Sequence, residues 1–449
     1  MNFRKRILIS FSILILSVLL TGCLRITADE LYSLPEVSEE YLRLQAQIND
    51  ILSQGAEYSP PTRGPNRQSV QLVNLTGTGP SEVIAFFSIP EESELLIYIF
   101  EFIDGDYTIS EIIPGIGTQF ESVRYADMDG DGVMELIIGR QMGSALRYMD
   151  IYSISSDLHS QMIVSSVEYT EISIFDLTNN GTDDVIIFRM PSQDVGGISE
   201  IYSLMQDGEV VKGEARLSSN IETISRIQTG KLNDDNTLAI FVDSEGTFDN
   251  GSLVTDIFAI YDDNYTNISL FAESGISETT VRYRMASSDI NKDGIVKVPA
   301  SRLLVAQSET EYFAIDWYAF GPTGRRVLKL TTYHNNFDEW FLILPFDWRE
   351  KVSVRRDDSV AGERTIIFSY VTDADEQHKD FLKIFKLSGE NAAGRATIGD
   401  RVYLMTEGNS VYAFEILAPP NSFGITFDET IIRENFRLIF SDWLVGSTA

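Results

Sequence analysis

The sequence predicts a mainly β protein: a β-propeller of about five four-stranded blades, followed by an α+β domain that ends in a helix. Three observations lead to this prediction. A polar loop between two apolar strands recurs about every 50 residues. Each recurrence is followed by two further segments of strand-like composition, which gives four strands per copy. The C-terminal part of the chain lacks the repeat and closes with apolar residues at helical spacing.

The five copies align when the first polar position of each loop is set in register. These first positions, separated by 53, 49, 55 and 58 residues, are Asn74, Asp127, Asp176, Lys231 and Asp289. An apolar residue stands four places before each of them: Val70, Val123, Ile172, Ile227 and Met285. An apolar strand begins nine places after each, although the strand at Val298 is weak. Each copy is therefore predicted to contain a strand, a tight polar loop and a second strand.

Two more strands follow in each of the first four copies. They are predicted at 95–102 and 107–113, 149–154 and 161–167, 201–205 and 209–215, and 254–261 and 266–271. Asp104-Gly105-Asp106 and Asp207-Gly208 mark hairpin turns between such pairs. A row of separate β-sandwich modules is the competing architecture. We prefer the propeller, because a unit of this length does not easily close a core alone.

The loop of the second copy carries the most specific motif. It runs Asp127-Met-Asp-Gly-Asp-Gly-Val-Met-Glu-Leu136. This run resembles the calcium-loop cassette of the FG-GAP and VCBS repeat family, which is known from integrin-type β-propellers. The resemblance covers roughly residues 66 to 335, is strongest in the second copy and is fair in the third and fifth.

The resemblance implies that side chains at loop positions 1, 3, 5 and 9 and the carbonyl at position 7 bind calcium. In the second copy these are Asp127, Asp129, Asp131, the Val133 carbonyl and Glu135. The third copy offers a weaker set, Asp176, Thr178, Asn180 and Asp184. The fifth offers Asp289, Asn291 and Asp293, but Lys297 stands where the last acid belongs. Its ammonium could take the place of a cation.

The other two loops have poorer ligands. They are Asn74, Thr76, Thr78 and Glu82 in the first copy, and Lys231, Asn233, Asp235 and Ala239 in the fourth. For these we expect polar turns whose side chains cap backbone groups. The same reading is the alternative for the whole set, but three converging carboxylates in the second loop would repel one another without a cation. We expect one or two calcium sites, with a structural role.

An EF-hand is excluded for the second loop. That motif needs a bidentate glutamate at position 12 and a helix on each side. Position 12 here is Ile138, and the flanking residues have the pattern of strands.

The formal net charge of −32 makes a nucleic-acid partner unexpected, because such a chain repels polyanions. Residues 1–22 have the form of a signal peptide: a basic Arg4-Lys5-Arg6, an apolar stretch and a cleavage site. Leu20-Thr21-Gly22-Cys23 resembles the lipobox of bacterial lipoproteins, which implies that Cys23 is lipidated and becomes the mature N-terminus. An ordinary signal peptide is the alternative. We expect an extracytoplasmic protein anchored to the outer face of the bacterial cell membrane, or to the outer membrane of a Gram-negative host.

Two segments flank the predicted propeller domain (66–335). Residues 23–65 are expected to form a tether, an amphipathic helix from Glu36 to Gln54 and a proline-rich linker. Residues 336–449 are expected to form the α+β domain, although a sixth blade at its start stays open. Its final helix is predicted from Asp428 to Leu444, with a capping box at Thr426 and Glu429. Its apolar stripe is Ile432, Phe436, Ile439, Phe440 and Trp443.

The sequence contains no motif that indicates catalysis. Its histidines, His159, His334 and His378, are scattered, and no metalloprotease, nucleophile-elbow or phosphate-loop pattern occurs. We therefore expect a non-catalytic surface lipoprotein that binds a protein or glycan ligand. The alternative is a calcium-dependent polysaccharide-active enzyme, a lyase or hydrolase. Arg124, Arg140 and Arg147 gather near the second copy and are expected to pair with carboxylates.

Overall fold

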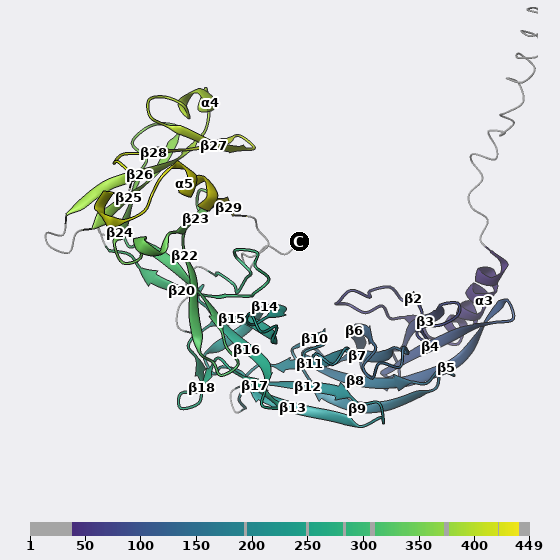
Figure 1. Cartoon of the computed structure of the whole chain (residues 1–449). Helices are drawn as coiled ribbons and strands as arrows, with labels where there is room; N and C mark the ends of the chain where they lie inside the picture. The colour runs from purple at the N-terminus through teal and green to yellow at the C-terminus, as the bar shows by residue number, and fades with distance from the viewer. Residues whose placement is uncertain are drawn as a thin grey trace, which may run out of the picture. The chain divides into compact units, whose positions relative to one another are not determined.

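The computed structural model describes residues 38–192, 195–247, 251–281, 284–305, 310–371, 377–420 and 422–439. Across these residues the chain is mainly β and its sheets are antiparallel, as predicted (Figure 1). The predicted signal peptide, Cys23, Phe440 and Trp443 lie outside the described residues. The described chain forms two compact units. The first comprises residues 38–61, 68–74 and 78–119, and the second comprises 62–67, 75–77 and the chain from 120 onward.

The first unit is a helix packed on a five-stranded sheet. The predicted amphipathic helix is confirmed as α3 (Glu39–Ser53). Its buried residues Leu44, Ile48 and Ile51 share a hydrophobic cluster with Phe87 and Phe100 of the sheet. The strands are β1 (Glu57–Tyr58), β2 (Val70–Val73), β3 (Glu82–Ile89), β4 (Glu94–Ile103) and β5 (Asp106–Ile116). The predicted hairpin joins β4 to β5 through Asp104 and Gly105, which both have positive φ angles.

Three four-stranded antiparallel sheets begin the second unit, each in simple sequential order. Each contains the loop-flanking strand pair and the hairpin that the sequence predicted. Their strands are β6 (Gln119–Ala126), β7 (Glu135–Met142), β8 (Leu146–Ile154) and β9 (Ser160–Glu168); β10 (Glu171–Phe175), β11 (Asp184–Arg189), β12 (Ile198–Leu204) and β13 (Val210–Arg216); β14 (Ile221–Lys231), β15 (Leu238–Gly246), β16 (Leu253–Tyr261) and β17 (Asn264–Asn267). The short pair β18 (Leu270–Phe271) and β19 (Ile276–Ser277) follows.

In each of these three sheets, the strand that follows the polar loop contains a continuous run of apolar residues, because both of its faces are buried. Successive side chains of a strand point to opposite faces of its sheet. In β11, Val185 and Ile187 join a cluster with residues of the β6–β9 sheet. Ile186 and Phe188 instead join a cluster with residues of the β14–β17 sheet. Neighbouring sheets of this unit therefore pack face to face, with the loop-flanking strands at the centre of the hydrophobic core.

Two five-stranded sheets complete the second unit. The first has the order β20 (Val298–Leu303), β21 (Phe313–Phe320), β22 (Arg326–Asn335), β23 (Trp340–Leu344) and β29 (Phe436–Leu438). The second has the order β24 (Val352–Asp357), β25 (Glu363–Val371), β26 (His378–Leu387), β28 (Ser410–Ile416) and β27 (Val402–Glu407). The expected boundary after residue 335 falls between β22 and β23, which are paired neighbours in one sheet.

Short helical segments connect the C-terminal strands. They are η1 (Phe346–Trp348), α4 (Ala392–Arg395), η2 (Ser422–Gly424) and α5 (Glu429–Asn435). A single hydrophobic cluster includes Trp340 and Trp348, both 1% exposed, together with residues of both five-stranded sheets and Ile432 of α5. These two tryptophans are core residues.

The predicted helix from Asp428 to Leu444 is wrong from Phe436 to Leu438, and its residues 440–444 lie outside the described residues. The helix α5 ends at Asn435, and Phe436–Leu438 form β29 at the edge of β23. Phe436 is buried and its ring lies 5.6 Å from that of Trp340, whereas Arg437 is exposed. This alternation suits an edge strand. The predicted capping box is also wrong, because the N-cap is Asp428, whose Oδ1 accepts the Ile431 N–H at 2.8 Å.

Candidate cation site

The five polar loops share a residue in the left-handed conformation at position 6, and all except the fourth have a second one at position 4. Position 6 has a positive φ in every loop: Gly79 (75°), Gly132 (86°), Gly181 (91°), Asn236 (61°) and Gly294 (87°). Glycine and asparagine are the residues that adopt this left-handed conformation most readily. The first four loops each connect two strands of one sheet. The fifth is closed by an isolated bridge between Ser288 and Lys297, directly before β20.

Backbone N–H groups within the loops donate to the loop side chains in a common pattern. The N–H of position 6 donates to the aspartate at position 1 in the second, third and fifth loops. The N–H of position 7 donates to the side chain at position 5 in the same three loops. Backbone capping, which was the alternative to cation binding, is thus present. It does not exhaust a carboxylate, whose two oxygens offer about four acceptor sites.

In the second loop three carboxylates converge. Oxygen atoms of Asp127, Asp129 and Glu135 all lie within 4.8 Å of one another. Glu135 is 1% exposed, because it is the first residue of the buried strand β7. Its Oε2 accepts the Met128 N–H at 2.8 Å. A group of hard oxygen donors at this spacing suits Ca²⁺, which takes six to eight oxygen ligands.

The electrostatics of this group favour a cation. Burial raises the pKa of Glu135 to about 7, and the charges of Asp129, Asp131 and Asp127 add to the rise. Burial also raises the pKa of Asp129, with further contributions from the Asp131 and Asp127 carboxylates. A positive ion among these oxygens would stabilise their charged forms.

Asp131, which is also an expected ligand, has a different place in this loop. Asp131 is exposed and lies outside the group of three carboxylates. Its Oδ1 accepts the Val133 N–H at 2.7 Å, which holds the backbone at position 7. The sequence did not distinguish Asp131 from Asp129, since both precede a glycine in an alternating run.

The third loop is closed by its own hydrogen bonds. The Asp184 carboxylate accepts the N–H groups of Leu177 and Thr178 and the Thr178 hydroxyl, at 2.9 to 3.1 Å. It also accepts the Ser203 hydroxyl from β12. Four donors around a fully buried carboxylate compensate its charge without an ion.

In the fifth loop an ammonium group lies among the oxygens. The Lys297 side chain is 0% exposed, and its Nζ lies 2.5 Å from Asp293 Oδ1 and 3.4 Å from Asp289 Oδ1. It also donates to the Ile295 carbonyl at 2.8 Å. Burial alone would raise the pKa of Asp293, but hydrogen bonds from Lys297, the Ile295 N–H and Asn291 lower it to about 2.

The first and fourth loops hold fewer charges. Glu82 at position 9 of the first loop is buried, while positions 1, 3 and 5 are Asn74, Thr76 and Thr78. In the fourth loop Asn233 Oδ1 accepts the Asp235 N–H at 2.9 Å, and position 9 is the buried Ala239.

Backbone hydrogen bonds join three pairs of adjacent loops. In the second, third and fifth loops, the N–H at position 8 donates to a carbonyl at position 1 or 2 of the preceding loop. These pairs are Met134 to Leu75 at 2.7 Å, Asp183 to Asp127 at 3.0 Å and Val296 to Lys231 at 3.0 Å. At Gly77 a Cβ would lie 2.3 Å from the Gly132 carbonyl, so only glycine fits there. The second loop is therefore in direct contact with its neighbours.

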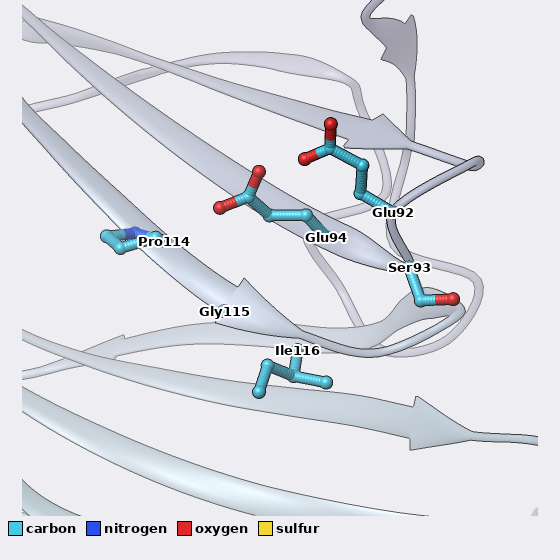
Figure 2. A pocket seen from close by; sticks show the side chains of 6 residues that line it. All are labelled: Glu92, Ser93, Glu94, Pro114, Gly115 and Ile116. Atoms are coloured by element: carbon cyan, nitrogen blue, oxygen red, sulfur yellow. The ribbon is translucent and has the colours of Figure 1, made fainter.

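The described residues include the linings of two open recesses. One of about 410 Å³ lies beside the second and third loops and is lined by Asp129, Asn180, Thr182 and residues 204–207. The other, of about 380 Å³, lies in the first unit where β3, β4 and β5 turn. Figure 2 shows Glu92 and Glu94 on one side of it and Ile116, near the end of β5, on the other.

The three histidines have different surroundings. His334 is buried, and burial lowers its pKa to about 3. His378 Nδ1 lies 2.8 Å from Ser353 Oγ, but Ser353 is fully buried. His159 is exposed beside Asp157.

The arginines near the second copy are mostly paired with carboxylates, as expected. Arg140 is paired with the buried Asp150, and Arg147 lies 3.7 Å from Glu121. Arg124 differs, because its Nε is buried without a hydrogen-bond partner.

Comparison with known proteins gives little further information. No family model and no curated protein matches the chain. Three solved structures are similar over much of it: Sqt1 of Saccharomyces cerevisiae (10% identity, 78% of this chain and 95% of that one, TM-score 0.29), the exotype rhamnogalacturonan lyase YesX (11%, 64% and 63%, 0.25) and a protein from Lactobacillus plantarum (7%, 72% and 85%, 0.24). TM-scores this low support no conclusion about fold or function. No helix among the described residues is long and apolar enough to span a bilayer.

Proposed function

We propose that this protein is a lipid-anchored extracytoplasmic scaffold whose repeats form a β-propeller of FG-GAP or VCBS type, stabilised by calcium in the second loop. The scaffold binds a protein or glycan ligand without chemical turnover. The observation that carries the proposal is the convergence of Asp127, Asp129 and Glu135 at one of five loops that share a left-handed residue at position 6.

The fifth loop supports the cation part of the proposal. There, a positive group lies against the oxygens of positions 1, 5 and 7. The second loop carries a glutamate at position 9 in place of that lysine, so its positive charge must come from outside the chain. Asp127, Asp129 and Glu135 would hold the ion, with the Val133 carbonyl and Asp131 as the remaining expected donors. The ion would neutralise the carboxylates and fix the loop between β6 and β7.

The propeller part rests on the sheets of the second unit. Four-stranded antiparallel meanders that pack face to face are the construction of propeller blades. In this proposal the repeats form a stack of sheets, and the ligand binds to loops at the surface of that stack.

Calcium titration tests the cation part. Isothermal titration of Ca²⁺ into the metal-stripped mature chain should give a saturable binding heat, and Mg²⁺ should bind more weakly because it demands a smaller octahedral site. The absence of any saturable calcium binding would contradict the proposal.

An activity screen tests the non-catalytic part. The mature chain should release no products from pectic or host glycans at any calcium concentration. Calcium-dependent depolymerisation would favour the polysaccharide-active enzyme instead.

The anchor has a separate test. Expressed in a bacterial host, the wild-type chain should partition with membranes, and Cys23→Ser should move it to the soluble extracytoplasmic fraction. Membrane association that survives this substitution would contradict lipidation at Cys23.

A further inference from the structure

Lys297 is the most deeply buried lysine among the described residues, with a side chain that is 0% exposed. A buried ammonium is costly unless it is paired and fully hydrogen-bonded. Here the three protons of Nζ meet three oxygens: Asp293 Oδ1 at 2.5 Å, the Ile295 carbonyl at 2.8 Å and Asp289 Oδ1 at 3.4 Å. The ammonium group is therefore surrounded by these three oxygen atoms, which we call the oxygen cage.

The cage is assembled from loop positions that have counterparts in the second loop. Asp289, Asp293 and the Ile295 carbonyl occupy positions 1, 5 and 7, and Lys297 occupies position 9. The corresponding residues of the second loop are Asp127, Asp131, Val133 and Glu135. Both loops place glycine with positive φ at position 6 and make the same backbone bonds to positions 1 and 5.

We propose that the fifth loop is a cation site whose cation is supplied by the chain itself, in the form of the Lys297 ammonium. The loop consequently needs no metal, and replacement of Lys297 by glutamate converts it into a Ca²⁺ site. A divalent ion cannot share the cage with the ammonium, because both require the same oxygens and carry the same sign of charge. The inference depends on the fifth loop alone and does not require calcium in the second.

The test compares three variants with the wild-type chain. Lys297→Glu restores a carboxylate at position 9, where the second loop carries Glu135. Lys297→Met keeps the length of the side chain and removes its charge. Lys292→Met is the matched control, because Lys292 lies in the same loop, is exposed and changes the net charge equally. Each chain is purified in calcium, stripped with a chelator and then analysed for bound Ca²⁺ per chain and for melting temperature.

The expected results separate this inference from the proposed function. Lys297→Glu should bind one more equivalent of Ca²⁺ than the wild type, whether the wild type binds one or none. Its melting temperature should rise with calcium by several degrees more than that of the wild type. Lys297→Met should melt several degrees below Lys292→Met in the absence of calcium, because two carboxylates lose their counter-ion.

Other results would overturn the inference. They are an unchanged calcium content in Lys297→Glu, a failure of that variant to fold even in calcium while Lys297→Met folds, or equal melting temperatures of Lys297→Met and Lys292→Met. A wild-type chain that binds no calcium would contradict the proposed function and leave the expected gain of one equivalent intact.

Discussion

The side chain at position 9 differs among the loops in charge and length, while the second, third and fifth loops keep the same backbone hydrogen bonds from positions 6 and 7. Glu135 brings a third carboxylate to the second loop. Asp184 is surrounded by four donors, and Lys297 supplies an ammonium. Position 9 therefore distinguishes the second, third and fifth loops from one another. In the first loop the same position is the buried Glu82, but positions 1, 3 and 5 carry no carboxylate.

Substitutions of Asp129 and of Asp131 should differ in their effect on the calcium affinity of the second loop. Loss of a residue that only hydrogen-bonds to a metal ligand already weakens metal binding about 10–100-fold. Asp129→Asn removes a carboxylate of the converging group and should weaken calcium binding at least that much. Asp131→Asn, in the same loop, should weaken it less, since Asp131 is exposed and outside the group. Titration calorimetry measures both, and a larger loss for Asp131→Asn would contradict the geometry.

His334 should make the folded protein sensitive to acid. Burial holds its pKa at about 3 in the folded state, against about 6.5 when exposed. The unfolded chain then binds a proton below about pH 6.5 that the folded chain cannot, so stability falls as pH falls toward 3. In His334→Gln this part of the acid destabilisation should disappear. Parallel profiles for wild type and His334→Gln would contradict the prediction.

The roles of some of these residues could be predicted from the sequence, and the roles of others could not. The role of Lys297 could be predicted, because loop spacing alone brings positions 1, 5 and 9 together. The compensation of Asp184 could not, since Ser203 comes from another strand of the sheet, 19 residues away. The split between Asp129 and Asp131 depends on the curl of the loop and was equally inaccessible.

At the scale of elements, backbone hydrogen bonds join three pairs of adjacent loops. Position 8 of the second, third and fifth loops donates to the preceding loop, so the proposed ion in the second loop would stabilise two backbone hydrogen bonds beyond its own ligands. One of them, from the Asp183 N–H, ends on the carbonyl of Asp127, an expected ligand residue.

Hydrogen exchange tests this connection. Chelation of calcium should speed amide exchange in peptides that contain Met134 and Asp183, because both hydrogen bonds depend on the second loop. The equivalent amide of Val296 provides an internal control. Its loop contains Lys297, so its exchange should not change. A uniform increase at all three amides would argue for general loosening, and no change at any would argue against the connection.

The strand β29 should contribute strongly to stability despite its length. Phe436 packs against Trp340 and Tyr412, with ring centroids 5.6 Å apart in each pair. Phe436→Ala should cost about 3–5 kcal/mol of unfolding free energy, the usual range for a buried phenylalanine. Arg437→Ala, at the neighbouring exposed position, should cost less than about 1 kcal/mol. Denaturant unfolding of both variants provides the comparison, and equal effects would contradict the placement of β29.

The end of α5 shows why the final helix was mispredicted. Ile432, Phe436 and Ile439 recur at helical spacing, but Phe436 and Leu438 also alternate like a strand. Periodicity alone does not choose between these patterns over so few residues. Pairing with the free edge of β23 selects the strand over the helix, and that edge exists only in the folded sheet. The repeated strands were predictable, by contrast, because their apolar runs are bounded by turn residues in every copy.

At the scale of the whole molecule, the described chain consists of antiparallel sheets, and related polar loops connect paired strands within four of them. The acidic balance of the sequence sets a constraint on this design, because a net charge of −32 opposes compaction. Internal cations such as Lys297, paired arginines such as Arg140 and the proposed calcium ion each offset part of that repulsion where carboxylates are closest.

Thermal unfolding of the metal-stripped chain with and without calcium tests the central claim most directly. Saturation at about 100 times the dissociation constant adds about 2.7 kcal/mol, which corresponds to a rise in melting temperature of roughly 3 °C when a chain of this size unfolds as one unit. Asp129→Ala should lose most of that rise. Identical melting temperatures of the wild-type chain in calcium and in chelator would contradict a stabilising ion in the second loop.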